Sequence, residues 1–318
     1  MSWGICRSMT ILLFPFLVLI GADATPPPAD PGVAPAVTAQ IALAMPTARV
    51  TPAAPRRLLV MTKTQGFRHA SIGAGCEALR QMSAATHAFD VTFSADLADL
   101  SSEHLAAFDG LLLLNTTQLK PDAGQKQALL DFVRVKGKGL IGIHAALDNF
   151  PGWPEGQQLM GGVFAGHPWG AGDTSAVKID DPANPVVAAF GGQGFWITDE
   201  IYQVSGAYSR TDLHVLLSLD MSHEENTRPA KAIVRTDHDH AIAWIAQRDA
   251  GRLFYTCLGH NPGLYAMPKV LQHYLDGIQF ALGDLTASSM PSATLPPMLL
   301  PVLAPAPPAS VHPAKASK

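Results

Sequence analysis

Apolar runs of strand length alternate with amphipathic stretches over the first half of the chain. Residues 56–62, 110–117 and 140–144 are runs too apolar for a surface strand, and residues 71–85 and 120–139 read as helices between them. A strand that is apolar on both sides indicates a parallel sheet with helices on both faces. With right-handed crossovers, this pattern predicts a doubly wound, flavodoxin-like α/β fold.

The second half of the chain has a different rhythm, with strands that follow one another over short connections. The expected strands cover 174–180, 194–204, 213–220, 241–247 and 251–259, before a closing helix over 268–284. Short connections do not allow parallel crossovers. We therefore expect these strands to extend the same sheet as antiparallel or mixed additions.

Composition agrees with one sizeable globular domain. The 318 residues are 47% hydrophobic and 15% charged, with a formal net charge of −4. A nucleic-acid-binding protein usually carries a concentrated basic face, and no such charge run occurs here. Nucleic acid is therefore not an expected partner, and the oligomeric state stays open.

The two ends of the chain differ from the middle. Residues 1–24 combine Arg7, an apolar run and a small-residue cleavage pattern, which predicts a signal peptide and an exported protein, periplasmic or secreted and free of the membrane after cleavage. An uncleaved anchor is the alternative. Residues 25–55 and 285–318 are rich in Pro and Ala and predict an extended linker and a disordered tail. The folded domain is then 56–284.

Cysteine usage changes this picture little. Cys76 falls on a predicted helix and Cys257 in a predicted strand. A domain of this size needs no disulfide for stability, and we expect two separate buried thiols.

Polar side chains follow four of the expected strands at their carboxyl ends. They are His69, Asn115, His144 and His260. Ligands of open α/β sheets bind beyond the carboxyl ends of the strands. We therefore expect these side chains to meet at one rim of the sheet.

Five motifs, in order, carry a resemblance to a known family. They are KTQGFRHASI, GKGLIGIHAALDNF, MGGVFAGHPWG, TDEIYQV and GRLFYTCLGH. Together they resemble the ThuA-like (trehalose utilisation) family, a branch of the class I glutamine amidotransferase-like fold. In the amidotransferases a Cys stands at the strand-to-helix elbow, where this chain has His144 between Gly142 and Ala146, while His260 matches their late histidine.

The resemblance implies an inherited pocket without the inherited thiol chemistry. A glutamine amidotransferase needs a thiolate at the elbow, so that activity is not expected. The family is linked to the metabolism of trehalose-type and oxidised glucosides, which implies a small-molecule carbohydrate, a glucoside or keto-sugar, as partner.

Two chemistries remain open for the histidines. His69, His144, His167 and His260, with acidic residues in nearby motifs, would suit Zn²⁺ or another divalent ion. The alternative is a metal-free site in which His144, His260 and Glu200 transfer protons. The ligand spacing is wholly non-local and does not decide between them.

The remaining candidates would bind the sugar. Trp153 and Trp169 either offer aromatic faces for a pyranose or serve as plain packing, and Arg68 either holds a carboxylate or keto oxygen or pairs with a surface acid. Asp148 either contacts the ligand or caps the segment that follows it. The full expected binding set is Arg68, His69, Asn115, Asp148, Trp153, His167 and Trp169. The chain is then either a carbohydrate-active enzyme or a binding module that does not turn its ligand over.

Overall fold

The computed structural model describes residue 1 and residues 33–229, 232–295 and 301–308. Within these residues, the centre is a nine-stranded sheet in the order β2-β1-β3-β4-β11-β10-β9-β6-β7. Its strands are β1 (Arg57–Met61), β2 (Asp90–Ser94), β3 (Gly110–Leu114), β4 (Gly139–Ile143), β6 (Thr174–Ile179), β7 (Phe195–Thr198), β9 (His214–Leu219), β10 (Ala241–Arg248) and β11 (Gly251–Thr256). A separate short pair joins β5 (Val163–Phe164) to β8 (Val204–Ser205).

Half of the sheet is parallel and half is antiparallel. Strands β2, β1, β3, β4 and β11 pair in parallel, whereas β10, β9, β6 and β7 continue the sheet in antiparallel register. This is the predicted α/β architecture with antiparallel additions. All five residues of β3 and all five of β4 are buried, as their apolar sequences require. The last strand, β11, lies parallel to β4 and brings the loop after it beside the loop after β4.

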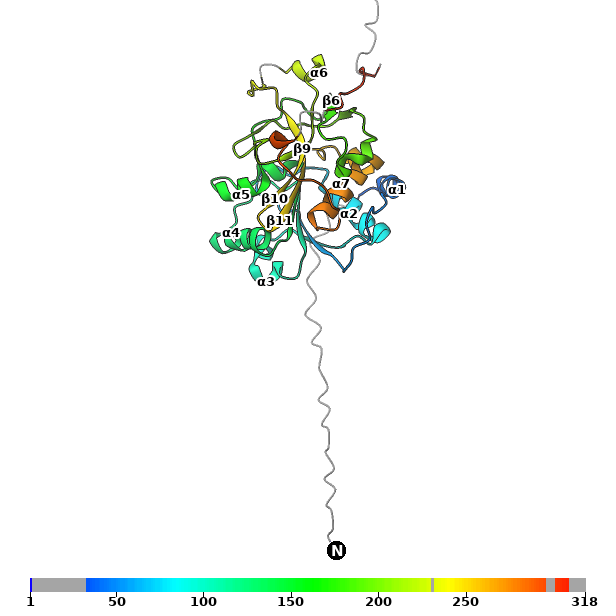
Figure 1. Ribbon diagram of the computed structural model, residues 1–318. Helices are drawn as coiled ribbons and strands as arrows, with labels where there is room; N and C mark the ends of the chain where they lie inside the picture. The colour runs from blue at the N-terminus through cyan, green and yellow to red at the C-terminus, as the bar shows by residue number, and fades with distance from the viewer. Residues whose placement is uncertain (2–32, 230–231, 296–300, 309–318) are drawn as a thin grey trace, which may run out of the picture.

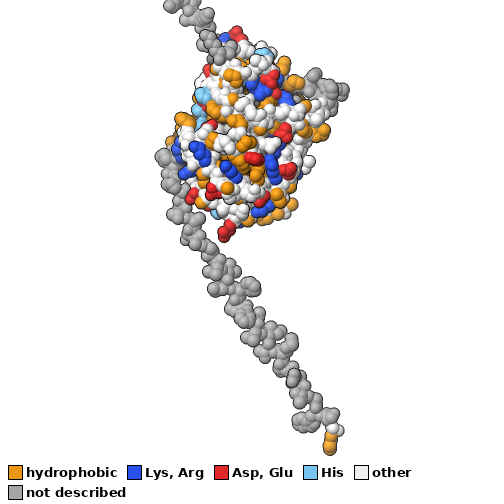
Figure 2. All heavy atoms as spheres, turned by 90° about the vertical axis from the view of Figure 1, so that its left-hand side faces the viewer, with side chains coloured by type: hydrophobic (Ala, Val, Ile, Leu, Met, Phe, Trp, Pro, Cys, Tyr) orange, Lys and Arg blue, Asp and Glu red, His pale blue; other side chains and the backbone are white. Residues whose placement is uncertain are grey.

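Helices cover both faces of the sheet (Figure 1). Figure 1 shows α3 (Ser102–Leu105), α4 (Ala123–Leu130) and α5 (Pro154–Met160) on one side, and α1 (Pro35–Leu43), α2 (Ile72–Thr86) and α7 (Pro268–Ala281) on the other. A short α6 (Glu224–Thr227) lies near β6. The face turned to the viewer in Figure 2 carries Lys and Arg side chains interspersed with Asp and Glu side chains.

Short helical turns complete the connections. They are η1 (Leu97–Leu100), η2 (Asp131–Val135), η3 (His144–Asp148), η4 (Pro185–Phe190), η5 (Pro262–Ala266) and η6 (Ser292–Thr294). The helix expected over 120–139 therefore continues beyond α4 as the π-helical turn η2. The strand expected over 194–204 is interrupted after Thr198. Residues 199 and 200 consequently lie in a loop rather than on a strand.

The interpretation of the region before the domain as an extended linker is wrong where the structure describes it. Residues 35–43 form α1, which packs against α2, and Ile41 is fully buried. Ala has the highest helix propensity of all residues, and the buried Ile41 anchors α1 to the domain. Residues 2–32, with the signal-peptide prediction, lie outside the described residues.

The interpretation of residues 285–318 as a disordered tail is also wrong for the described part. Val302 pairs with Ile179 at the antiparallel end of the sheet, through backbone hydrogen bonds in both directions. The Trp196 indole donates to the Pro305 carbonyl oxygen. Backbone hydrogen bonding needs no bulky side chains, which explains why composition alone suggested disorder.

Two further features concern the whole described chain. Cys76 and Cys257 form no disulfide with each other, as predicted, and Cys257 is buried, whereas Cys76 is only half-buried. Among the described residues, no helix has the length and apolar character needed to cross a bilayer.

Candidate metal centre

His144 occupies a sharp corner directly after β4. Its φ is +49°, in the left-handed region that few non-glycine residues adopt, and its side chain is fully buried. The ring Nδ1 lies 2.7 Å from the Cys257 carbonyl oxygen. Because a carbonyl oxygen only accepts, Nδ1 carries the hydrogen and donates it, which leaves the lone pair of the neutral ring on Nε2. This bond orients the ring and fixes its tautomer.

His260 is held by a buried carboxylate beneath its loop. Asp199, which is fully buried, accepts hydrogen bonds from the backbone N–H groups of Gly259 at 2.8 Å, His260 at 3.2 Å and Asn261 at 2.8 Å. Burial is the largest influence on Asp199 and raises the pKa of its carboxyl. The Asp199 carboxylate thus fixes the backbone that carries the His260 ring.

Glu200 brings a carboxylate to both rings. Its Oε1 lies 3.3 Å from His260 Nδ1 and 3.6 Å from His144 Nε2, and those two nitrogens are 3.3 Å apart. Three ligand-type atoms therefore form a nearly equilateral triangle. They come from loops after β4, β7 and β11, so neither half of the sheet could build the triangle alone.

His69 stands beside this triangle, edge-on to both other rings. Its centroid is 4.9 Å from that of His144 and 5.1 Å from that of His260. Burial, reinforced by the two neighbouring histidines, lowers the pKa of His69 to about 3, so this ring is neutral near pH 7. Ligand atoms of His69, His144, Glu200 and His260 all lie within 4.8 Å of one another.

The spacing of this group fits a divalent ion. A tetrahedral Zn²⁺ with bonds of about 2.0–2.1 Å separates its ligand atoms by about 3.3–3.4 Å. The observed separations of 3.3, 3.3 and 3.6 Å match that geometry without rearrangement. Imidazole nitrogens with one carboxylate form a donor set typical of Zn²⁺ and similar ions.

The charges within the group also favour a cation. Burial acts to raise the pKa of the Glu200 carboxyl, but its contacts with His144 and His260 outweigh burial and hold that pKa well below its usual range. The same contact with Glu200 raises the pKa of His260. Glu200 therefore stays ionised in this buried setting and requires positive charge beside it.

A cavity of about 390 Å³ opens beside the group. Five of the predicted site residues border it: His69, Asp148, His167, Glu200 and His260. The side chains that the sequence reasoning overlooked are Phe67, Thr117, Phe164 and Tyr202. The Tyr202 ring lies 4.4 Å from both the His144 ring and the Phe164 ring, centroid to centroid. Tyr202 stands two residues after Glu200 in the motif TDEIYQV, and that spacing could have drawn attention to it.

His167 and Asp148 lie at the edge of the cavity and outside the ligand triangle. His167 Nδ1 is 3.4 Å from Glu200 Oε2, and its side chain is 54% exposed, so Glu200 takes the place that His167 was expected to hold among the metal ligands. The Asp148 carboxylate accepts from the Gln118 amide at 2.6 Å, and burial raises its pKa.

Three residues expected to bind substrate contribute to the scaffold instead. Asn115 is fully buried, and its amide nitrogen donates to Ser71 Oγ and the Gly259 carbonyl oxygen. Trp153 packs edge-on against Phe150, and the Trp169 indole donates to the Asn226 carbonyl oxygen. Both indoles are almost fully buried and neither borders the cavity at the triangle. Pro- and Gly-rich loops drew attention to them, but aromatic packing explains them.

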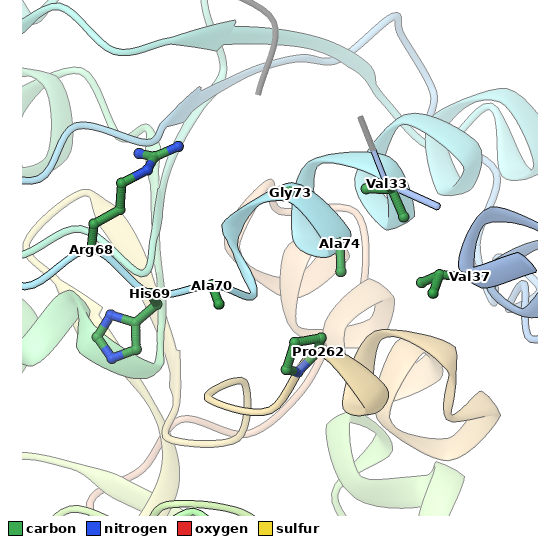
Figure 3. Close-up of a pocket in the computed structure, with 8 residues that line it drawn as sticks. All are labelled: Val33, Val37, Arg68, His69, Ala70, Gly73, Ala74 and Pro262. Carbon is green, nitrogen blue, oxygen red and sulfur yellow. The ribbon is translucent and has the colours of Figure 1, made fainter. Parts of the chain in front are cut away.

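Arg68 is exposed next to His69, and the two side chains extend in different directions (Figure 3). Arg68 does not border the cavity at the triangle; it borders a second cavity that this loop lines in part. The expected pairing of Arg68 with a ligand at the triangle is therefore not supported by its position.

Solved structures of similar proteins share this fold. A ThuA-like protein from Bacteroides uniformis matches with a TM-score of 0.58 at 20% identity, over 76% of this chain and 98% of that one. A ThuA-like protein from Parabacteroides merdae matches with a TM-score of 0.56 at 18% identity, over 74% and 93%. No curated protein matches the chain.

The sequence itself also matches a family model. The model is described as ThuA, trehalose utilisation, and it covers residues 57–281, from the start of β1 to the end of α7. That range contains every residue of the group described above. The chain therefore belongs to the ThuA family.

Proposed function

We propose that this protein is a carbohydrate-active enzyme that acts on a glucoside or keto-sugar at a divalent metal centre. The observation that carries the proposal is the triangle of His144 Nε2, His260 Nδ1 and Glu200 Oε1, with separations of 3.3–3.6 Å. Membership of the ThuA family supports a carbohydrate-related role. Three protein ligands with a further open position are typical of catalytic zinc sites.

The ion, when bound, supplies Lewis-acid polarisation of a sugar oxygen. The chain's own residues then orient the substrate and provide its hydrogen-bond partners. Phe164 and Tyr202 offer ring faces to the apolar side of a pyranose, and Thr117 offers a hydroxyl to its polar groups. The His69 ring borders the same cavity, and because it is neutral near pH 7 it offers one nitrogen as a hydrogen-bond acceptor to a sugar hydroxyl.

We also propose that the protein works outside the cytoplasm. The support is the basic and apolar leader pattern of residues 1–24. The second candidate function is a module that binds a sugar or small metabolite without turning it over. The lack of an attacking thiol or similar nucleophile at the elbow favours that candidate.

The decisive experiment combines metal analysis with a substrate panel. The purified chain is stripped with a chelator and reloaded with Zn²⁺, and its metal content is measured by elemental analysis. Glucosides and keto-glucosides are then incubated with stripped and reloaded protein, with products followed by mass spectrometry and binding by thermal shift. The proposal expects about one ion per chain and metal-dependent product.

Two outcomes contradict it in different ways. Thermal stabilisation by a sugar without any product supports the binding module. Zinc that does not bind stoichiometrically to the reloaded protein removes the metal centre.

A further inference from the structure

A second cavity, of about 420 Å³, is lined in part by the loop that carries His69 (Figure 3). Most of its lining is apolar: Val33, Val37, Ala70, Gly73, Ala74 and Pro262 border it, together with Arg68 and His69. Figure 3 shows the Val37 and Ala74 side chains and the Pro262 ring around one space between α1, α2 and the loop after β11. Its size falls within the range of small-molecule sites.

One wall of this cavity comes from outside the family domain. Val33 and Val37 belong to residues 33–50, which we name the N-terminal strap, whereas the family match begins at residue 57. The family model does not cover this strap. Because it forms a wall of a cavity that His69 also borders, the strap is placed to influence which ligands the domain accepts.

The strap is held in place by buried polar side chains of α7. Asp276 and Gln279 are fully buried, yet neither takes part in the candidate centre. Asp276 Oδ2 accepts from Arg49 Nε at 2.8 Å. Gln279 accepts from the Arg49 backbone N–H at 3.2 Å and donates to the Val50 carbonyl oxygen at 2.5 Å. Buried polar groups without such partners are costly, so the strap and the wall it forms are fixed parts of the fold.

His69 separates the two cavities and borders both. Its ring makes edge contacts with His144 and His260, while Figure 3 shows that ring turned away from Val37. The loop after β11 is shared in the same way, with His260 at the first cavity and Pro262 at the second. A ligand group that extends from the candidate centre past either loop therefore contacts the apolar lining of the second cavity.

We propose that the second cavity binds the apolar aglycone of a glycoside whose sugar lies at the metal centre. The proposal rests on the proposed function for the position of the sugar. Six of the eight lining residues have no polar side chain, so the cavity favours an aryl or alkyl group over a second sugar, which would need more hydrogen-bond partners. The strap then determines which glycosides the domain accepts.

The test compares two glucosides that differ only in the aglycone. Phenyl and methyl glucoside, each as both anomers, are titrated into the zinc-loaded full chain by calorimetry. Phenyl glucoside is expected to bind at least about tenfold more tightly than methyl glucoside, because its ring leaves water. V37F fills the cavity and is expected to abolish that preference while methyl glucoside binds as before.

A39F is the matched control. Ala39 lies on the exposed side of α1, so this variant adds the same ring outside the cavity and is expected to keep the preference. V37D, which adds charge with little bulk, repeats the test if V37F melts early. Equal affinity of wild-type protein for the two glucosides overturns the proposal, as does a preference that survives both Val37 variants.

A separate measurement distinguishes this proposal from the proposed function. Phenol alone is added to protein with ¹³C-labelled Val and Ala methyl groups, and the Val37 and Ala74 signals are followed by NMR. This probe needs neither metal nor sugar. Shifted signals support the apolar site even if zinc and methyl glucoside fail to bind, and unmoved signals overturn it even if both bind.

Discussion

The buried histidines His144 and His214 make the same kind of contact through Nδ1 and different contacts through Nε2. Both rings are fully buried, and both Nδ1 atoms donate to a backbone carbonyl oxygen, Cys257 at 2.7 Å for one and Met290 at 2.6 Å for the other. His214 Nε2 then meets Asp181 Oδ2 at 2.9 Å. His144 Nε2 instead faces a nitrogen at 3.3 Å and a carboxylate oxygen at 3.6 Å, with a cavity beside them.

The difference separates a histidine paired within the scaffold from one that belongs to a candidate site. At His214 the ring and the carboxylate satisfy each other at hydrogen-bond distance. At His144 the spacing is wider, and Nε2, the His260 Nδ1 to which it is hydrogen-bonded and the Glu200 carboxylate surround a common point that suits a cation. A buried ring nitrogen alone does not make such a group, since His273 Nε2 lacks a hydrogen-bond partner and is packed between Phe190 and Phe254.

Removing the His144 ring is the largest test of this difference. H144N is preferable to alanine because Asn tolerates the left-handed backbone at φ +49°. We expect bound zinc to fall from about one ion per chain to a trace, and metal-dependent turnover to be lost, while the melting temperature changes by only a few degrees. Elemental analysis and calorimetric melting measure both quantities.

The matched control is H87N. His87 also has a left-handed φ, of +52°, but it is exposed at the end of α2. It is expected to keep both metal and activity. Retention of stoichiometric zinc in well-folded H144N would show that His144 is no ligand.

The reverse pattern is expected at His214. H214A leaves the buried Asp181 carboxylate without its partner, which lowers the free energy of unfolding by about 3 kcal/mol. Zinc content should be unchanged, because none of the hydrogen bonds that His214 makes with described residues involves His69, His144, Glu200 or His260. Urea denaturation and metal analysis of the same preparation test the two halves. Equal loss of zinc and stability in H214A would erase the distinction between the two histidines.

The third buried histidine gives the protein a predictable acid sensitivity. Burial lowers the pKa of His273 from 6.5 to about 4, so the unfolded chain binds a proton there that the folded chain does not. The stability is fully present above pH 6.5 and is lost as the pH falls from there toward 4. Between pH 7 and pH 5 this residue alone should cost about 2 kcal/mol of unfolding free energy.

The variant H273Q isolates that contribution. Gln keeps a donor for the Val186 carbonyl oxygen, which His273 Nδ1 contacts at 2.8 Å, but it does not titrate. Its unfolding free energy should fall less steeply with acidity than that of the wild type. Urea denaturation at pH 5 and pH 7 gives both unfolding free energies. An equal loss between the two pH values in H273Q and in the wild type would contradict the assignment of this acid sensitivity to His273.

Local pattern and strand-end logic were enough to predict the parallel half of the sheet and the meeting of His69, His144 and His260. These residues follow buried strands, and parallel neighbours place their carboxyl ends together. The place of Glu200 in this group was harder to predict, since it depends on where the strand before it stops. Trp153 and Trp169 show the opposite error, because loop composition does not reveal whether an indole faces a cavity or a neighbouring ring. The strap was missed because its buried side chains are few, with Ile41 the bulkiest, and because its buried polar partners on α7 are distant in sequence.

Asp199 gives the test with the smallest expected effect, because its side chain influences the candidate centre only through the backbone of residues 259–261. Its carboxylate accepts three N–H groups from residues 259–261, and D199N would turn an amide donor toward donors. The loop must shift, and His260 Nδ1 moves relative to the other two ligand atoms. We expect zinc affinity to fall by about tenfold, in line with outer partners of metal ligands elsewhere. Competition with a chelator measures it, and D173N, which alters an exposed carboxylate that accepts from one backbone N–H, is the control. Unchanged affinity in D199N would mean that His260 holds its position without this support, and the rigidity attributed to the triangle would then have to come from His144 alone.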